Sequence, residues 1–308
     1  MATALITHAA FLEHVTPEGH PERVARLEHV LHALEGVELQ RVTAPMAAED
    51  DLLRIHPKAY LEELRAAAPD KGLAQLDGDT FLSPGSLEAA TRGAGAVVRA
   101  VDMVLSGEVA NAFCAIRPPG HHAEKDTAMG FCLFGNAALA AKHALDHHGL
   151  SRVAVVDFDV HHGNGTQDVL WDEKRALLIT SQQMPLWPGS GKPDETGAFD
   201  NVLNVTLAPD TDGTVMRAAY ESQVFPRLRA FKPEMIVISA GFDAHRDDPL
   251  AGLNWDTDDF RWLTRQLCAI AAELCDGRVV STLEGGYDLE ALAQSTRAHV
   301  EELLEAGK

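Results

Sequence analysis

Apolar β-branched runs alternate with amphipathic helical patterns along most of this 308-residue chain. Apolar residues recurring every three to four positions predict helices over 21–34, from Pro57, from Ser83-Pro84 towards Gly107, and over 136–147, 214–230, 258–274 and 288–304. Short continuous apolar runs predict strands over 112–116, 153–156, 177–180, 202–206, 235–239 and 279–283. Strands of this kind are buried on both faces, so the alternation predicts an α/β fold with a central, mostly parallel sheet between helical layers.

Hydrophobic residues make up 46% of the chain and are spread evenly, without a linker, repeat or low-complexity tract. We therefore expect a single three-layer α/β/α domain over residues 1–308. No apolar run approaches the roughly 18 residues that a membrane span needs. The N-terminus lacks the features of a signal peptide, and the four cysteines show no C-x-x-C spacing. These features favour a cytoplasmic protein with reduced thiols and no membrane partner.

The formal charge of −20 argues against nucleic-acid binding through a basic patch. An acidic surface attracts cationic substrates such as lysine-rich tails or polyamines. The same charge is equally compatible with solubility alone, and the composition does not decide between these two interpretations.

Chemically reactive residues follow four of the predicted strands. Ligands of open α/β sheets bind beyond the carboxyl ends of the strands, so these four segments are expected to meet along one edge. The segments are Arg117-Pro118-Pro119-Gly120-His121-His122, Asp157-Phe158-Asp159-Val160-His161-His162-Gly163-Asn164-Gly165, Ala240-Gly241-Phe242-Asp243 and Glu284-Gly285-Gly286-Tyr287.

Asp159 and His161 stand two positions apart, so on an extended strand end their side chains point to the same side. With Asp243 they would supply the three protein ligands that a catalytic zinc requires. A strand ending in Asp and His is also found in hydrogen-bonded turns, so this pattern alone leaves both interpretations open.

Two further features suit amide hydrolysis. The pair His121-His122 on a Pro-Pro-Gly turn could supply a general base, although adjacent histidines on loops are often inert. Tyr287 follows two glycines, so its hydroxyl could donate to an oxyanion, although a tyrosine in such a place often serves loop packing alone.

Together these four segments resemble the zinc-dependent histone deacetylase and acetylpolyamine amidohydrolase family, in its class II and bacterial form. His20-Pro21-Glu22-Arg23, Asp79-Thr80 and Ser83-Pro84-Gly85-Ser86 share the resemblance, which extends from His8 to Tyr287. It implies an open arginase/deacetylase α/β fold and hydrolysis of an acetyl-amide to acetate and a free amine.

The resemblance also implies roles for individual residues. Asp159, His161 and Asp243 match the ligands of one catalytic zinc. His122 matches the general base and acid, His121 its electrostatic partner, and Tyr287 the residue that polarises the carbonyl. Asp157 and Asn164 match the partners that orient the two histidines; a neutral Asn164 would not raise the basicity of His122 as a carboxylate would.

Further assignments follow from the same resemblance. Gly130, Phe131 and Trp187 match the walls of a narrow tunnel, with Leu250 near its mouth. A structural potassium site would use the side chains of Asp157, Asp159 and Ser181 and the carbonyl of His161. Arg23 is expected beneath the zinc, near the exit for acetate.

We therefore expect a zinc-dependent deacetylase acting on an acetyl-lysine peptide or a small N-acetyl amine. The apolar Leu250 favours these substrates over acetylpolyamines, which remain an alternative. Two other hypotheses are a weakly catalytic module that binds acetylated ligands and a two-metal ureohydrolase, which needs more metal-ligand aspartates than these motifs contain. A homo-oligomer is compatible with the sequence.

Overall fold

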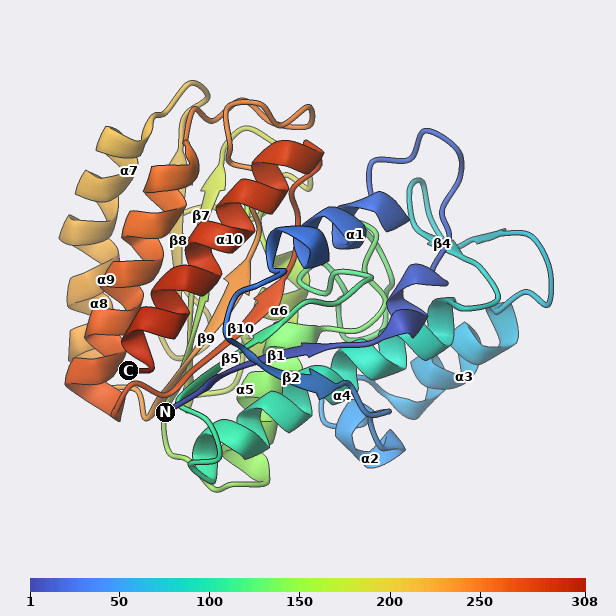
Figure 1. Ribbon diagram of the computed structural model, residues 1–308, viewed down its shortest axis with the longest axis horizontal. Helices are drawn as coiled ribbons and strands as arrows, with labels where there is room; N and C mark the ends of the chain where they lie inside the picture. Colours follow the sequence, from blue (N-terminus) through green and yellow to red (C-terminus); the bar gives the residue numbers. More distant parts are fainter.

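The computed structural model describes residues 1–308 and contains one eight-stranded sheet in which every strand pairing is parallel (Figure 1). The strand order is β2-β1-β5-β10-β9-β6-β7-β8. The strands are β1 Thr3–Thr7, β2 Gln40–Thr43, β5 Asn111–Cys114, β6 Val153–Asp157, β7 Ala176–Gln183, β8 Val202–Leu207, β9 Met235–Ala240 and β10 Val279–Leu283. A separate antiparallel pair joins β3 Ala74–Gln75 to β4 Phe81–Leu82.

Helices cover both faces of the sheet. In Figure 1 the helices α7 to α10 form a row on one side of the strands, and α4 and α5 lie on the other. The helices are α1 Val24–Ala33, α2 Glu49–Leu52, α3 Lys58–Ala67, α4 Ser86–Leu105, α5 Asn136–Asp146, α6 Asn164–Leu170, α7 Gly213–Ala219, α8 Phe225–Phe231, α9 Thr257–Cys275 and α10 Leu289–Ala306. The three-layer α/β/α fold predicted from the sequence is therefore confirmed. None of the helices is both long and apolar enough to cross a lipid bilayer.

The four central strands, β5, β10, β9 and β6, are neighbours in the sheet and carry the four reactive segments at their carboxyl ends. They are adjacent although β5 and β10 lie far apart in the sequence. All residues of β6, β9 and β10 are buried, because helices pack against both faces of these strands. The predicted meeting of the four segments along one edge is confirmed.

Some predicted boundaries were wrong. The strands β1 and β2 were not predicted. β2 lies at the sheet edge and alternates between half-buried and exposed residues, so it lacks a continuous apolar run. Helix α1 begins at Val24 rather than Pro21, since Arg23 is extended and Glu22 is buried in an ion cluster.

The helix predicted over 214–230 is one α–π–α run, with a π-helical turn at Tyr220–Val224. Pro226, whose nitrogen carries no hydrogen for a helical bond, follows the π turn after one intervening residue, Phe225.

The four cysteines are free and buried, and Cys268 and Cys275 lie on α9 as expected.

Candidate active site

Three predicted metal ligands lie together at the carboxyl ends of β6 and β9. Their ligand atoms all lie within 4.8 Å of one another. His161 Nδ1 lies 3.2 Å from Asp159 Oδ1 and 3.1 Å from Asp243 Oδ2. The remaining carboxylate oxygens are held by the backbone: Gly285 N–H donates to Asp159 Oδ2 and Val160 N–H donates to Asp243 Oδ1. One oxygen of each carboxylate is thus aimed at the imidazole.

The donor set fits a divalent cation. Burial and the nearby Asp159 raise the pKa of Asp243 to about 6, because two buried carboxylates repel each other. Burial lowers the pKa of His161, but hydrogen bonds to Asp159 and Asp243 outweigh burial and raise it to about 10. The raised pKa values of Asp243 and His161 both mean that a positive charge between the carboxylates is favoured. Two carboxylates and one imidazole are suitable ligands for zinc.

Glycines let the neighbouring loops approach these ligands. A Cβ at position 285 would lie 2.2 Å from Asp243 Oδ2 and 2.5 Å from Asp159 Oδ2. A Cβ at position 241 would lie 2.1 Å from Asp159 Oδ2. Gly241 and Gly285 are therefore required by close packing against the carboxylates.

The two adjacent histidines lie beside this cluster and are both buried. His121 Nδ1 lies 3.0 Å from Asp157 Oδ2, and its Nε2 lies 3.7 Å from Asp159 Oδ2. Burial disfavours a charged His121, but the Asp159 and Asp157 carboxylates outweigh burial and raise its pKa well above the usual range. Burial, His121 and His161 lower the pKa of His122. The pair therefore favours a charged His121 and a neutral His122.

Glu284 holds the histidine turn against the end of β10. Its carboxylate accepts hydrogen bonds from Gly120 N–H at 2.6 Å and from His121 N–H at 3.1 Å. Burial raises the pKa of Glu284 to about 7. Glu284 belongs to one of the four predicted motifs, but the sequence assigned it no role. Its carboxylate contacts a turn more than 160 positions away, and no local pattern predicts such a contact.

A pocket of about 350 Å³ leads to His122, His161 and Tyr287. The predicted tunnel residues Gly130, Phe131, Trp187 and Leu250 all line it. The lining also includes residues for which no role was predicted: His20, Pro21, Gly78, Asp79, Phe81 and Leu186.

Aromatic rings shape the pocket walls. The Trp187 ring meets the His122 ring edge to face at 4.7 Å between centroids, and Phe131 meets Tyr287 in the same way at 5.8 Å. Burial raises the pKa of Tyr287 well above its usual range, so the phenol stays protonated. Its O–H is therefore available as a donor at neutral pH.

The arginine predicted beneath the site was misplaced by three positions. Arg23 is exposed, whereas Arg26 is fully buried. Arg26 donates to the carbonyls of Gly286 and Glu284 at 2.6 and 2.5 Å, and its guanidinium lies 4.9 Å from the centroid of the Tyr287 ring. Arg23 is the extended residue just before α1, and it is exposed.

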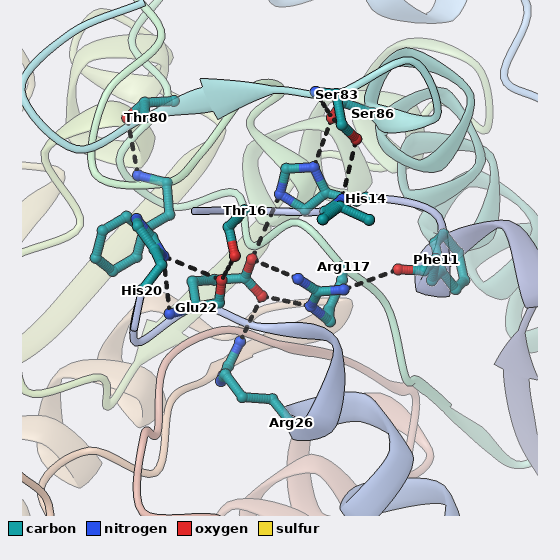
Figure 2. Close-up of polar contacts among 12 residues, drawn as sticks. Phe11, His14, Thr16, His20, Glu22, Arg26, Thr80, Ser83, Ser86 and Arg117 are labelled. Atoms are coloured by element: carbon teal, nitrogen blue, oxygen red, sulfur yellow. Dashed lines mark hydrogen bonds and ion pairs between the residues drawn. The ribbon is translucent and has the colours of Figure 1, made fainter. Parts of the chain in front are cut away.

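Arg26 belongs to the buried ion cluster shown in Figure 2. Glu22 accepts from Arg26 at 3.1 Å and from Arg117 Nη2 at 2.7 Å, and His14 Nε2 lies 3.4 Å from the same carboxylate. Burial raises the pKa of Glu22, but Arg117 and His14 more than offset it and hold that pKa well below its usual range. This cluster joins the segment before α1, which carries His20 of the pocket, to the turn that carries the two histidines.

Ser181, predicted to contribute to a potassium site, lies within β7 beside β6. Its hydroxyl is 2.6 Å from the hydroxyl of Tyr220. Asp157 already holds His121 and accepts from Asp159 N–H at 3.0 Å. The potassium assignment stays a prediction.

Comparisons with known proteins identify the family of this chain. The model of the histone deacetylase domain matches residues 20–303. The histone deacetylase-like amidohydrolase of Pseudomonas aeruginosa is 41% identical, with 92% of this chain and 76% of that protein aligned. A probable deacetylase of Archaeoglobus fulgidus is 37% identical over 94% of this chain and 82% of its own length. The crystal structure of the HDA15 HD domain superposes with a TM-score of 0.93 at 31% identity, covering 99% and 89% of the two chains. This chain therefore belongs to the histone deacetylase family.

Proposed function

We propose that this protein is a zinc-dependent deacetylase that hydrolyses an acetyl-amide to acetate and a free amine. The observation that carries the proposal is the cluster of Asp159, His161 and Asp243, whose His161 lines the same pocket as His122 and Tyr287. When bound by those three ligands, a zinc ion would supply Lewis-acid polarisation of the acetyl carbonyl and of the attacking water.

The protein's own groups then account for the proton transfers. A neutral His122 accepts a proton from water as the oxygen attacks the carbonyl carbon, and it delivers that proton to the leaving nitrogen as the C–N bond breaks. The Tyr287 hydroxyl donates to the carbonyl oxygen as negative charge develops there. Asp157 and Glu284 hold the histidine turn through His121.

Turnover of an acetyl-lysine peptide with and without a chelator tests the proposal. We expect activity that a chelator removes and zinc restores. His122→Ala and Tyr287→Phe should each lose most turnover while zinc remains bound. Wild-type turnover in either variant would refute the role given to that residue, and tight binding of acetylated peptides without turnover would favour the binding-module alternative.

The acyl donor is proposed to be acetyl-lysine or another small N-acetyl amine. The apolar Leu250 favours these over polyamines, but Asp79 lines the same pocket from a different loop and adds an acidic group. The values of kcat/KM for acetyl-lysine peptides, acetylputrescine, acetylspermidine and longer acyl-lysines would rank the candidates. If Asp79→Asn selectively lowers kcat/KM for the polyamines, the acidic group recognises their second ammonium.

A potassium ion held by Asp157, Asp159, Ser181 and the carbonyl of His161, a cytoplasmic location and a homo-oligomer are further proposals. Activity measured in potassium against sodium or tetramethylammonium salts tests the first of these, and light scattering tests the oligomer.

A further inference from the structure

A second group of metal-ligand side chains lies away from the proposed active site. Asp102 of α4 and three histidines at the end of α5, His143, His147 and His148, place one ligand atom each within 4.8 Å of one another. Asp102 Oδ1 lies 2.8 Å from His143 Nε2 and 2.8 Å from His148 Nε2. Two imidazole nitrogens therefore converge on a single carboxylate oxygen.

The buried histidine of this group has an unsatisfied ring nitrogen. His143 is 3% exposed, and its Nδ1 has no hydrogen-bond partner. A carboxylate oxygen of Asp51 on α2, Oδ1, lies 3.8 Å from that nitrogen. Metal-bound histidines characteristically direct their second ring nitrogen at a carboxylate, which fixes the tautomer and the ring orientation. Asp51 is in the right place for that role, although Arg54 also lies 3.6 Å from it.

Regular secondary structure produces the convergence. His143 and His147 stand four positions apart on one face of the helix, and their rings stack at 4.7 Å with an angle of 10°. The helix ends at Asp146, so the chain can turn the adjacent His148 towards Asp102. His147 and His148 are exposed, whereas His143 is buried where α5 packs against α4.

We propose that Asp102, His143, His147 and His148 form a second divalent metal site, specific for a transition metal such as Zn²⁺. Three imidazoles and one carboxylate suit Zn²⁺, Co²⁺, Ni²⁺ or Cu²⁺, whereas Mg²⁺ and Ca²⁺ require oxygen ligands. One ligand atom of each residue already lies within 4.8 Å of the others, so movement of the two exposed rings would bring all four to a common ion at about 2.0–2.2 Å. A bound ion would link α4 to α5 and stabilise the folded chain.

This site is separate from the catalytic one. Helix α5 begins beside the histidine turn, where a Cβ on Gly120 would lie 2.6 Å from Asn136 N, and its other end carries the cluster. Eleven residues of helix place the two ends about 15 Å apart. A count of two metals per chain would therefore not by itself indicate a two-metal ureohydrolase. The proposal does not depend on the proposed activity.

Binding of Co²⁺, followed by its visible absorption and by equilibrium dialysis, tests the site in the whole protein. We expect two ions per wild-type chain, and one in the His147→Ala/His148→Ala double variant with deacetylase activity unchanged. Asp243→Asn should remove the other ion, and combining the three substitutions should leave none. The exposed pair His29 and His32 on α1 provides a matched control, since replacing both with alanine should not change the count.

Thermal unfolding provides a second readout. Added Zn²⁺ should raise the Tm of the Asp243→Asn variant, and this rise should disappear when His147 and His148 are also replaced. The proposal is overturned if the double histidine variant binds as much Co²⁺ as the wild type, or if the wild type binds only the ion removed by Asp243→Asn. If Asp243→Asn leaves the count unchanged, the catalytic zinc site is refuted instead.

Discussion

Asn164 Oδ1 lies 2.7 Å from Nδ1 of His122, and this contact fixes which nitrogen of the imidazole is free. The amide orientation is set by Glu124, whose carboxylate accepts from Asn164 Nδ2 at 2.8 Å. The Asn164 oxygen must therefore accept from His122, so Nδ1 carries the proton and Nε2 keeps its lone pair. Because the Asn164 amide is neutral, it does not offset burial, His121 and His161, which lower the pKa of His122.

Asn164→Asp should move the pH dependence of activity. An added carboxylate favours the protonated imidazole, so the pKa of His122 rises and the acidic limb of kcat/KM moves to higher pH by about one unit. The pH profile of kcat/KM measures the shift. In Asn164→Asp the new carboxylate also faces Glu124 and repels it. Adding Glu124→Gln to Asn164→Asp removes that repulsion, so the effect on His122 can be measured alone. An unchanged acidic limb would mean that His122 is not the group titrating in it.

Gly130→Ala should cost about a hundredfold in kcat/KM, because small displacements of reacting groups have effects of that size. Gly130 has a φ of +57°, and a Cβ there would lie 2.5 Å from His122 Cδ2 and 2.6 Å from Trp187 Cη2. Steady-state kinetics provides the measurement. The control is Gly252→Ala, whose Cβ meets only Gln183 Oε1 at 3.5 Å and should leave kinetics unchanged. Equal effects of the two substitutions would contradict this account of the pocket wall.

Arg26→Lys should lower kcat roughly tenfold and reduce the Tm. A lysine keeps the charge, but it cannot reproduce the planar fork that donates to Gly286 and Glu284 while pairing with Glu22. Arg23→Lys, three positions earlier and exposed, should change neither quantity. If Arg23→Lys proved the more damaging substitution, the original sequence prediction would be restored.

His299 should make the protein less stable in mild acid. Its ring is fully buried between Thr264 Oγ1 at 2.7 Å and Ser281 Oγ at 2.8 Å, and burial lowers its pKa from 6.5 to about 3. Since the folded pKa is below the unfolded one, its stabilisation is complete above about pH 6.5 and is lost progressively as the pH falls towards 3. Between pH 7.5 and pH 5 the loss is about 2 kcal/mol.

Urea unfolding at pH 7.5 and pH 5 measures that loss. His299→Gln removes the titrating group, so its free energy of unfolding should depend less on pH than that of the wild type. Buried His56, whose pKa is lowered to about 4, contributes in the same direction in both proteins. Parallel pH dependences in wild type and variant would show that His299 does not titrate on unfolding.

The sequence alone determined the layered parallel fold and the reactive strand ends. Both are local properties: β-branched runs form buried strands, and the residues that follow a strand lie at its carboxyl end. The resemblance carried by four motifs then named Asp159, His161, Asp243, His122 and Tyr287, which the structure brings together in one site.

Only the tertiary structure decided which distant groups support that site. Glu284 reaches back to the histidine turn, Arg26 rather than Arg23 lies under Tyr287, and Asp79 enters the pocket from a separate loop. The second histidine cluster likewise requires Asp102 of α4 to lie against the end of α5. Such contacts depend on how helices and loops pack across long sequence separations, and side-chain periodicity carries no information about that packing.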